Sequence, residues 1–317
     1  MITLASDFGS PYPAAMRGVI RRESDAEILD VSHDLPRGDP RAAAFWLRFV
    51  LPEFPPAVHC AVVDPGVGTD RAAVAVRAGD HVLVAPDNGL ALPPARALAA
   101  DVDGSGRDDG WFSDDGRPAD GRLGDDGRIE VFEILVDDPA SATFHGRDVF
   151  APAAARIRET IASVAESTRS AAETADGPSP GDPVGDALAS LPRLTRTTEF
   201  VDLTLPTATV EDDTAHGEVL VVDDFGNAIT NVPGSFLHDR DASRDVDRNP
   251  DRDVDRDRMG RVRVNGDPVP VVETFADVPP GDRLVTVGSH GYLECDVNDG
   301  RGDEAFGLSP GDVIRFS

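Results

Sequence analysis

Short apolar runs alternate with amphipathic stretches in the first half of the chain, and this pattern predicts strands and helices in turn. The runs ITLAS, AEILDVS, AVHCAVVD, AAVAVRA, HVLVAP and RIEVFEIL are typical of buried strands. The stretches YPAAMRGVIRRE, PRAAAFWLRFVLPEF and DVFAPAAARIRETIASVAES carry apolar residues at helical spacing. Alternating strands and helices predict a Rossmann-like α/β domain, in which a mostly parallel sheet is covered on both faces.

The second half has a different pattern, with short strand-like runs such as GEVLVVDD, RLVTVGS and YLECDV between Gly, Pro and Asp turns. It predicts an all-β, barrel-like domain. We therefore expect an α/β domain at 1–170, a linker at 171–195 and a β-barrel-like domain at 196–317. An Asp/Gly-rich stretch at 101–127 predicts a solvated loop, and the Asp/Arg repeat at 239–258 predicts an insertion in the second domain.

Acidic residues dominate the charge, and this narrows the possible partners. The chain has 58 Asp and Glu residues but only 30 Lys and Arg residues, so its formal net charge is −28 at pH 7. All 30 of these basic residues are arginines. Nucleic acids and anionic membranes bind basic surfaces, so neither is expected as a partner. The acidic residues are spread along the chain and do not form one patch for a basic partner. This distribution favours a halophilic archaeal source, in which high internal salt screens the repulsion between the acidic side chains.

The two cysteines, Cys60 and Cys295, both fall in strand-like apolar runs, where buried thiols are common. Two cysteines make neither a disulfide framework nor a zinc site. No apolar run approaches the ~20 residues that span a bilayer, and the chain starts with a strand rather than a basic and apolar leader. The expected location is the cytoplasm.

Polar residues follow three of the predicted strands. Asp7 follows ITLAS in the motif SDFG, Asp64 and Arg71 belong to VVDPGVGTDR, and Asn88 lies in APDNGL. Ligands bind beyond the carboxyl ends of strands in α/β sheets, so these side chains are candidates for a site. Structural roles compete with this interpretation: a helix N-cap for Asp7, a surface ion pair for Asp64 with Arg71, and a simple turn for Asn88.

A fourth motif, TFHGRDVFAPAAA, places His145 in the loop before a predicted helix. An imidazole at the rim of the sheet can hold or move a proton near neutral pH. A capping or core histidine is the competing interpretation, and this motif alone does not decide between them.

Taken with VSHDLP and, in the second domain, DDFGNAITN, these motifs resemble the S-adenosyl-L-methionine hydroxide adenosyltransferase family, whose relatives are fluorinases and chlorinases. The likeness covers nearly the whole chain, with six motifs in one order. The resemblance implies an N-terminal α/β domain, a C-terminal β-barrel domain and a homotrimer with sites between subunits.

The activity that the resemblance implies is hydrolysis of S-adenosyl-L-methionine (SAM) to adenosine and L-methionine, with no cofactor and no metal. Matched by motif, Asp64, Arg71 and His145 are the catalytic residues that place and activate water for attack on C5′. Residues that match the family's substrate contacts are Asp7, Asn88, Asp223, Phe225, Asn227, Ser289, Tyr292 and Glu294. For Phe225, filling the barrel core is the structural alternative.

Three other functions compete. A halogenase would attack C5′ with chloride or fluoride, but the halogenases lack the set of Asp64, Arg71 and His145. A nucleotide-binding module would only hold adenosine with the same polar residues. A metal-dependent hydrolase would need ligands at metal-site spacing, which one histidine among scattered carboxylates does not supply.

Overall fold

The computed structural model describes residues 1–101, 129–136, 141–174, 181–237 and 260–317. They divide into two compact units, which meet in the sequence between Thr204 and Leu205, and each unit is described by itself. The predicted loop at 101–127, apart from Asp101, and the predicted insertion at 239–258 lie outside the described residues.

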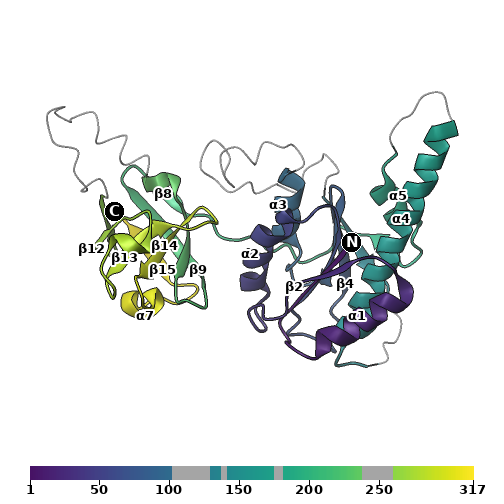
Figure 1. The fold of residues 1–317 in the computed structure, drawn as a ribbon, viewed down its shortest axis with the longest axis horizontal. Coiled ribbons are helices and arrows are strands. Elements are labelled where there is room, and N and C mark those ends of the chain that lie inside the picture. Colours follow the sequence, from purple (N-terminus) through teal and green to yellow (C-terminus); the bar gives the residue numbers. More distant parts are fainter. Residues whose placement is uncertain (102–128, 137–140, 175–180, 238–259) are drawn as a thin grey trace. The chain divides into compact units, whose positions relative to one another are not determined.

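A β-sheet forms the centre of the first unit (Figure 1). It has seven strands, in the order β2-β1-β3-β5-β4-β6-β7. The strands are β1 (Ile2–Ser6), β2 (Ile28–Ser32), β3 (Val58–Val62), β4 (Ala73–Ala78), β5 (His81–Pro86), β6 (Ile129–Ile134) and β7 (Leu194–Arg196). Strands β1, β2, β3, β5 and β6 run in one direction, and β4 and β7 run in the other. Strands β4 and β5 are antiparallel because only two residues connect them. The predicted α/β domain with a mostly parallel sheet is confirmed.

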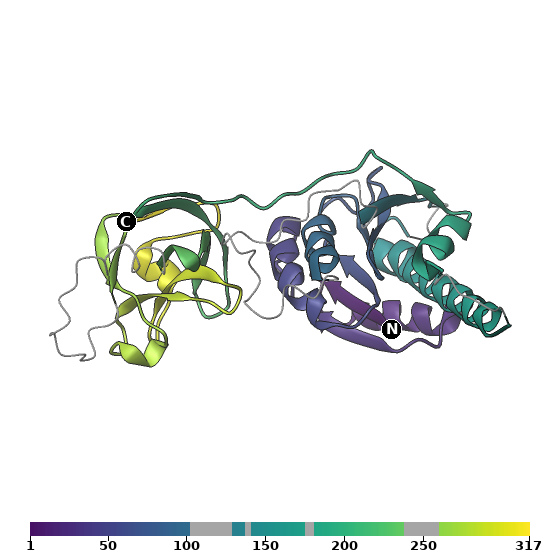
Figure 2. The same ribbon diagram turned by 90° about the horizontal axis from the view of Figure 1, so that it is seen from above.

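Helices cover both faces of this sheet (Figures 1 and 2). The α-helices are α1 (Tyr12–Glu23), α4 (Ala151–Thr174) and α5 (Pro183–Ser190) on one face, and α2 (Pro40–Val50) and α3 (Leu92–Asp101) on the other. A 3-10 turn, η1 (Leu51–Glu53), follows α2. Successive strand residues point to opposite faces, so Ile2 and Leu4 of β1 join one core and Ala5 joins the other. Within the described part of the chain, every helix is too short or too polar to span a lipid bilayer.

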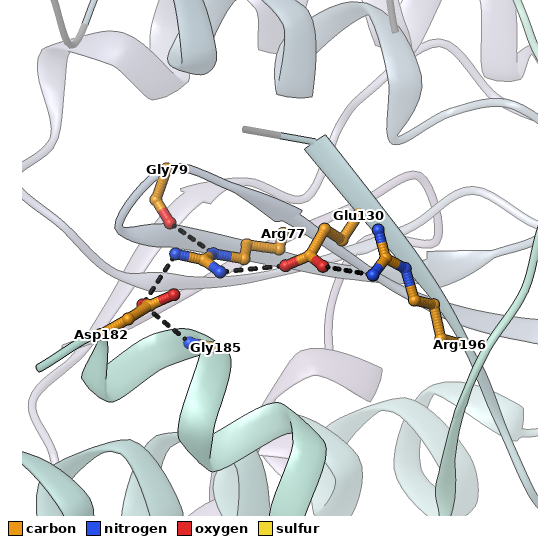
Figure 3. A network of polar contacts seen from close by, with 6 residues as sticks. All are labelled: Arg77, Gly79, Glu130, Asp182, Gly185 and Arg196. Atoms are coloured by element: carbon orange, nitrogen blue, oxygen red, sulfur yellow. Dashed lines mark hydrogen bonds and ion pairs between the residues drawn. The ribbon is translucent and has the colours of Figure 1, made fainter. Parts of the chain in front are cut away.

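A network of charged side chains attaches α5 and β7 to the sheet (Figure 3). Arg77 on β4 donates to Glu130 on β6 at 2.9 Å and to Asp182, the N-cap of α5, at 2.7 Å. Arg196 on β7 lies 3.1 Å from the other oxygen of Glu130. Part of the segment predicted as a linker, 171–195, therefore forms the edge of the first unit.

The second unit is a curved β-sheet with strands in the order β12-β11-β15-β9-β10-β14-β13, and β8 pairs with β9. Its elements are β8 (Thr209–Glu211), β9 (Thr214–Val222), β10 (Ala228–Pro233), β11 (Arg261–Val264), β12 (Asp267–Pro270), η4 (Phe275–Asp277), β13 (Arg283–Val287), β14 (Tyr292–Val297), α7 (Gly302–Phe306) and β15 (Val313–Phe316). The Val272 N–H donates to the Val285 carbonyl at 3.0 Å, which joins the two ends of the sheet. The predicted barrel-like domain is confirmed.

Candidate active site

Two of the predicted site residues follow neighbouring parallel strands of the first unit. Asp7 follows β1 and Asp64 lies just beyond β3, so both carboxylates come to the same edge of the sheet. They line one cavity of about 520 Å³, and His145 lines it as well. The tertiary structure thus brings together three side chains that are widely separated in the sequence.

The Asp64 carboxylate organises the turn that follows β3. It accepts a hydrogen bond from the Gly66 N–H at 3.0 Å, and the Arg71 Nε lies 3.4 Å from the same oxygen. The Asp64 side chain is 6% exposed and the Arg71 side chain is 28% exposed, so the carboxylate of this ion pair is largely covered while the guanidinium is partly open to solvent. The Arg71 guanidinium packs on the Cα of Gly66, where a Cβ would lie 2.8 Å from Nε.

His145 stands where the loop meets a π-helical turn, η2 (Gly146–Phe150), that leads into α4. Such turns are uncommon and are frequent at functional sites. His145 also lines a second cavity of about 560 Å³, together with Arg71 and Glu133. His145 therefore borders both the cavity with Asp7 and Asp64 and the cavity with Arg71. Among the residues that the structure describes, no hydrogen bond of its ring is found.

Asp7 is held by the loop after β2 and does not cap a helix. Its Oδ2 accepts a hydrogen bond from the Gly38 N–H at 2.7 Å. Pro11 is the N-cap residue of α1, without a side-chain cap, so the helix-cap interpretation of Asp7 is wrong. Its other carboxylate oxygen can accept a bond from a ligand.

Three aromatic rings that sequence reasoning missed line the cavity beside Asp7. Phe8, Tyr12 and Phe144 meet edge to face, with centroids 5.4 to 6.2 Å apart. The Arg147 guanidinium lies 5.2 Å from the Phe144 centroid. Ring faces attract a cation. The signal was present in the sequence, since Phe8 directly follows Asp7 and Phe144 directly precedes His145.

Asn88 supports the site from behind. Its side-chain amide donates to the Val63 carbonyl at 2.8 Å, and its Oδ1 accepts from the Leu90 N–H at 3.2 Å. The bond to Val63 fixes the residue just before Asp64. Both ends of the Asn88 amide thus bond to backbone, and this residue does not line the cavity that holds Asp7.

In the second unit, the DDFGN turn joins β9 to β10 and carries three predicted substrate contacts. The Asp223 carboxylate accepts bonds from the backbone N–H groups of Phe225 and Asn227, at 2.9 and 2.8 Å, and from the Asn227 side chain at 3.0 Å. These bonds present the Phe225 ring to solvent, where it is 78% exposed. The alternative in which Phe225 fills the barrel core is therefore wrong.

The last predicted contacts, Ser289, Tyr292 and Glu294, lie on and before β14. Ser289 is exposed, whereas Tyr292 and Glu294 are buried. The Glu294 Oε1 lies 2.6 Å from the His290 Nε2, so this carboxylate already has a partner within the unit. Ser289 is the one of the three that presents its side chain at the surface.

An α/β sheet with charged and aromatic residues around a cavity at the carboxyl ends of its strands is typical of an enzyme that binds a small polar molecule. Among the residues that the structure describes, no group of three or more His, Cys, Asp or Glu side chains is arranged to hold a metal ion.

Comparison with known proteins agrees with this class. Residues 2–105 match the SAM hydroxide adenosyltransferase N-terminal domain, and residues 217–315 match the C-terminal domain. The (R)-S-adenosyl-L-methionine hydrolase of Salinispora tropica is 36% identical over 322 residues, covering 100% of this chain and 97% of that protein. The Thermus thermophilus protein of the same name is 36% identical over 98% of this chain and 97% of its own length. The chain belongs to the SAM hydroxide adenosyltransferase family.

A solved structure supports the fold as well. The crystal structure of a conserved protein from Thermotoga maritima covers 100% of both chains, with a TM-score of 0.66 and 28% sequence identity.

Proposed function

We propose that this protein hydrolyses SAM to adenosine and L-methionine. The observation that carries the proposal is the convergence of Asp64, Arg71 and His145 on adjoining cavities at the carboxyl edge of the sheet. The relatives from Salinispora tropica and Thermus thermophilus carry the name of this activity.

The reaction is a displacement at C5′ of the substrate. The water oxygen forms a bond to C5′, the C5′–S bond breaks, and the methionine sulfur keeps the electron pair. The water loses a proton, which His145 accepts and passes to solvent. The Arg71 cation favours the developing hydroxide, while Asp64 fixes the guanidinium in position. Because the positive charge on the sulfonium makes methionine a good, neutral leaving group, placing and activating water is the main task of these residues.

The substrate contacts remain part of this proposal. Asp7 binds the ribose hydroxyls with its free oxygen, and Asn88 supports the turn of Asp64. The aromatic wall of Phe8, Tyr12 and Phe144 faces the sulfonium. Residues assigned to the adenosyl and methionine groups in the second unit are Asp223, Phe225, Asn227, Ser289, Tyr292 and Glu294.

Incubation with SAM in high salt tests the function, with product analysis by chromatography and mass spectrometry. We expect adenosine and methionine in equal amounts, unaffected by a chelator or by exchange of chloride for sulfate. 5′-Chloro-5′-deoxyadenosine would identify a halogenase, and inhibition by the chelator would identify a metal-dependent hydrolase. Binding of SAM without any product would leave only a binding module.

The sulfonium of SAM is a stereocentre, and the relatives are named for its (R) form. We propose the same preference for this chain. Separated (R) and (S) epimers should then give different kcat/KM values, with the (R) form faster. Equal rates would contradict the preference while leaving hydrolysis itself intact.

The oligomeric state, the source organism and the location in the cell are also proposals. We propose a homotrimer with sites between subunits, as the resemblance to the family implies. Light scattering in high salt should then give three times the chain mass of 33.5 kDa.

We also propose a halophilic archaeal source, which the charge of −28 supports, and a cytoplasmic location, which the two buried thiols support. Fractionation of source cells tests the location.

A further inference from the structure

The SDFG turn that carries Asp7 is bonded to the loop after β2, which holds the otherwise unexplained motif VSHDLP. The Gly9 N–H donates to the His33 carbonyl at 2.9 Å, and the Leu35 N–H donates to the Ser6 carbonyl at 3.1 Å. The Gly38 bond to the Asp7 carboxylate belongs to the same set. The loop after β2 therefore fixes both the backbone beside Asp7 and the carboxylate itself.

Side chains reinforce this attachment. The Ser6 hydroxyl is fully buried, and it lies 2.7 Å from the His33 Nδ1. A buried hydroxyl needs a hydrogen-bond partner, and among the described residues His33 is the partner of Ser6. Asp7 directly follows Ser6, so the bond between the imidazole and Ser6 restrains the residue next to Asp7.

His33 is itself held from its other side. Its Nε2 lies 3.1 Å from the Asp30 carboxylate, although not aligned for a hydrogen bond, and Asp30 also contacts Arg17. Burial acts to raise the pKa of Asp30, but His33 and Arg17 outweigh it and hold that pKa below its usual value. Asp30 is thus an anion at neutral pH, and it restrains the ring.

Serine, histidine and aspartate in a row suggest a nucleophilic triad, but the geometry excludes one. The Ser6 side chain has no exposed surface, so its oxygen cannot reach a substrate. The arrangement can hold a backbone segment in place, and the segment that it holds leads directly to the cavity.

We propose that His33 is a positioning residue, which acts through Ser6 to hold the Asp7 carboxylate where it binds the ribose hydroxyls of SAM. This inference rests on the proposed function and goes beyond it, since neither His33 nor Ser6 touches the substrate. It assigns to the VSHDLP loop the support of the ribose site.

The test measures the dissociation constant of adenosine, the product that carries the ribose, by calorimetry on the full chain. His33→Ala should raise this constant about tenfold and change kcat by less than about twofold. His33→Asn places an amide where Nδ1 lies, so it should restore binding to within about twofold of wild type. His216→Ala, at an exposed histidine in the second unit, is the matched control.

A double-mutant cycle separates positioning from a merely structural role. In the Asp7→Ala background, His33→Ala should cause no further loss of adenosine binding, because the group that it positions is already gone. If His33→Ala does not fold, Ser6→Ala replaces it in the cycle with the same expected results.

Failure of the His33 role and failure of the proposed function give different results. Unchanged adenosine binding in His33→Ala, or losses that simply add to that of Asp7→Ala, would overturn the role of His33 while SAM hydrolysis by the wild type stands. Adenosine binding without SAM hydrolysis would refute the proposed function, and the cycle would still test the role of His33. A wild type that neither binds adenosine nor hydrolyses SAM would overturn both.

Discussion

At the scale of single residues, Arg71 and His145 should matter for turnover far more than for folding. We expect His145→Ala and Arg71→Ala each to lower kcat/KM by about 10²–10⁴-fold, since general-base and charge contributions are of that size. Steady-state kinetics with SAM and thermal unfolding measure the two effects. His216→Ala and Arg22→Ala, at exposed positions, are the controls. Near-normal activity in both site variants would contradict the mechanism.

Gly66 offers a subtler test of Arg71. A Cβ on Gly66 would lie 2.8 Å from Nε and 2.9 Å from Cζ of Arg71, which is too close. The guanidinium is the far end of a flexible side chain and can move, so Gly66→Ala should lower kcat/KM with little change in melting temperature. Gly18→Ala, where nothing lies within 4 Å of the added methyl, should keep full activity. Loss of stability without loss of activity would refute this account.

The sequence singled out four polar residues that line the two cavities of the first unit, but not their bonding. Asp7, Asp64 and Arg71 stand out because they follow apolar strands, and His145 stands out because it lies in the loop before a helix. Asn88 has the same local pattern, yet its amide is taken up by backbone groups. Hydrogen bonds between residues far apart in the chain depend on packing, which a local pattern does not contain.

At the scale of elements, β14 carries a buried acid that should make the second unit sensitive to alkali. Both Asp296 oxygens are buried without a hydrogen-bond partner among the described residues. Burial, and then the nearby Glu294 carboxylate, raise the pKa of Asp296 from 3.8 to about 9. The folded state thus binds a proton that the unfolded state releases, and stability falls as pH rises from 3.8 to 9.

Asp296→Asn should remove this slope, because the asparagine does not titrate. As pH rises within that interval, the free energy of unfolding of the variant should increase relative to that of wild type by at most about 1.4 kcal/mol per pH unit. Urea unfolding at pH 6, 7 and 8 measures the difference, with the exposed Asp213→Asn as control. Parallel curves for wild type and Asp296→Asn would contradict the assignment.

The prediction of helix α1 succeeded because one of its faces is polar. Helix α1 has alternating buried and exposed residues, and its predicted bounds are those observed. Helices α3 and α5 were not predicted. Nearly every residue of α3 is buried, so it lacks the polar face that gives a helical period, and α5 has only 8 residues.

At the scale of the whole molecule, a histidine pair at the amino-terminal ends of the strands should link folding to acid. His59 stacks on His81, bonds it at 2.9 Å, and lies 2.8 Å from the Thr3 hydroxyl. Burial, and then the charge of His81, lower the pKa of His59 from 6.5 to about 3. The unfolded state therefore binds more protons between pH 6.5 and 3, and stability falls as pH falls through that interval.

His59→Asn keeps a group to bond Thr3 but does not titrate, so it should flatten this loss of stability. Urea midpoints at pH 7, 6, 5 and 4 measure the slope, and His216→Asn controls for an exposed histidine. The difference in the free energy of unfolding between His59→Asn and wild type should change by at most about 1.4 kcal/mol per pH unit. Equal slopes in all three proteins would show that His59 does not control the acid response.

The sequence by itself determined strands β1 to β6, the fold class and the polar residues that follow β1 and β3, because apolar strand runs and polar strand ends are local properties. Only the tertiary structure decided which strand ends are neighbours. Pairing of β1 with β3 brings Asp7 to Asp64, and the start of α4 brings His145 to the same cavity. Burial also decided the bonding of Ser6 to His33. These contacts join residues that are distant in the sequence. They form because burial of apolar surface drives the helices onto the sheet and brings the strands together.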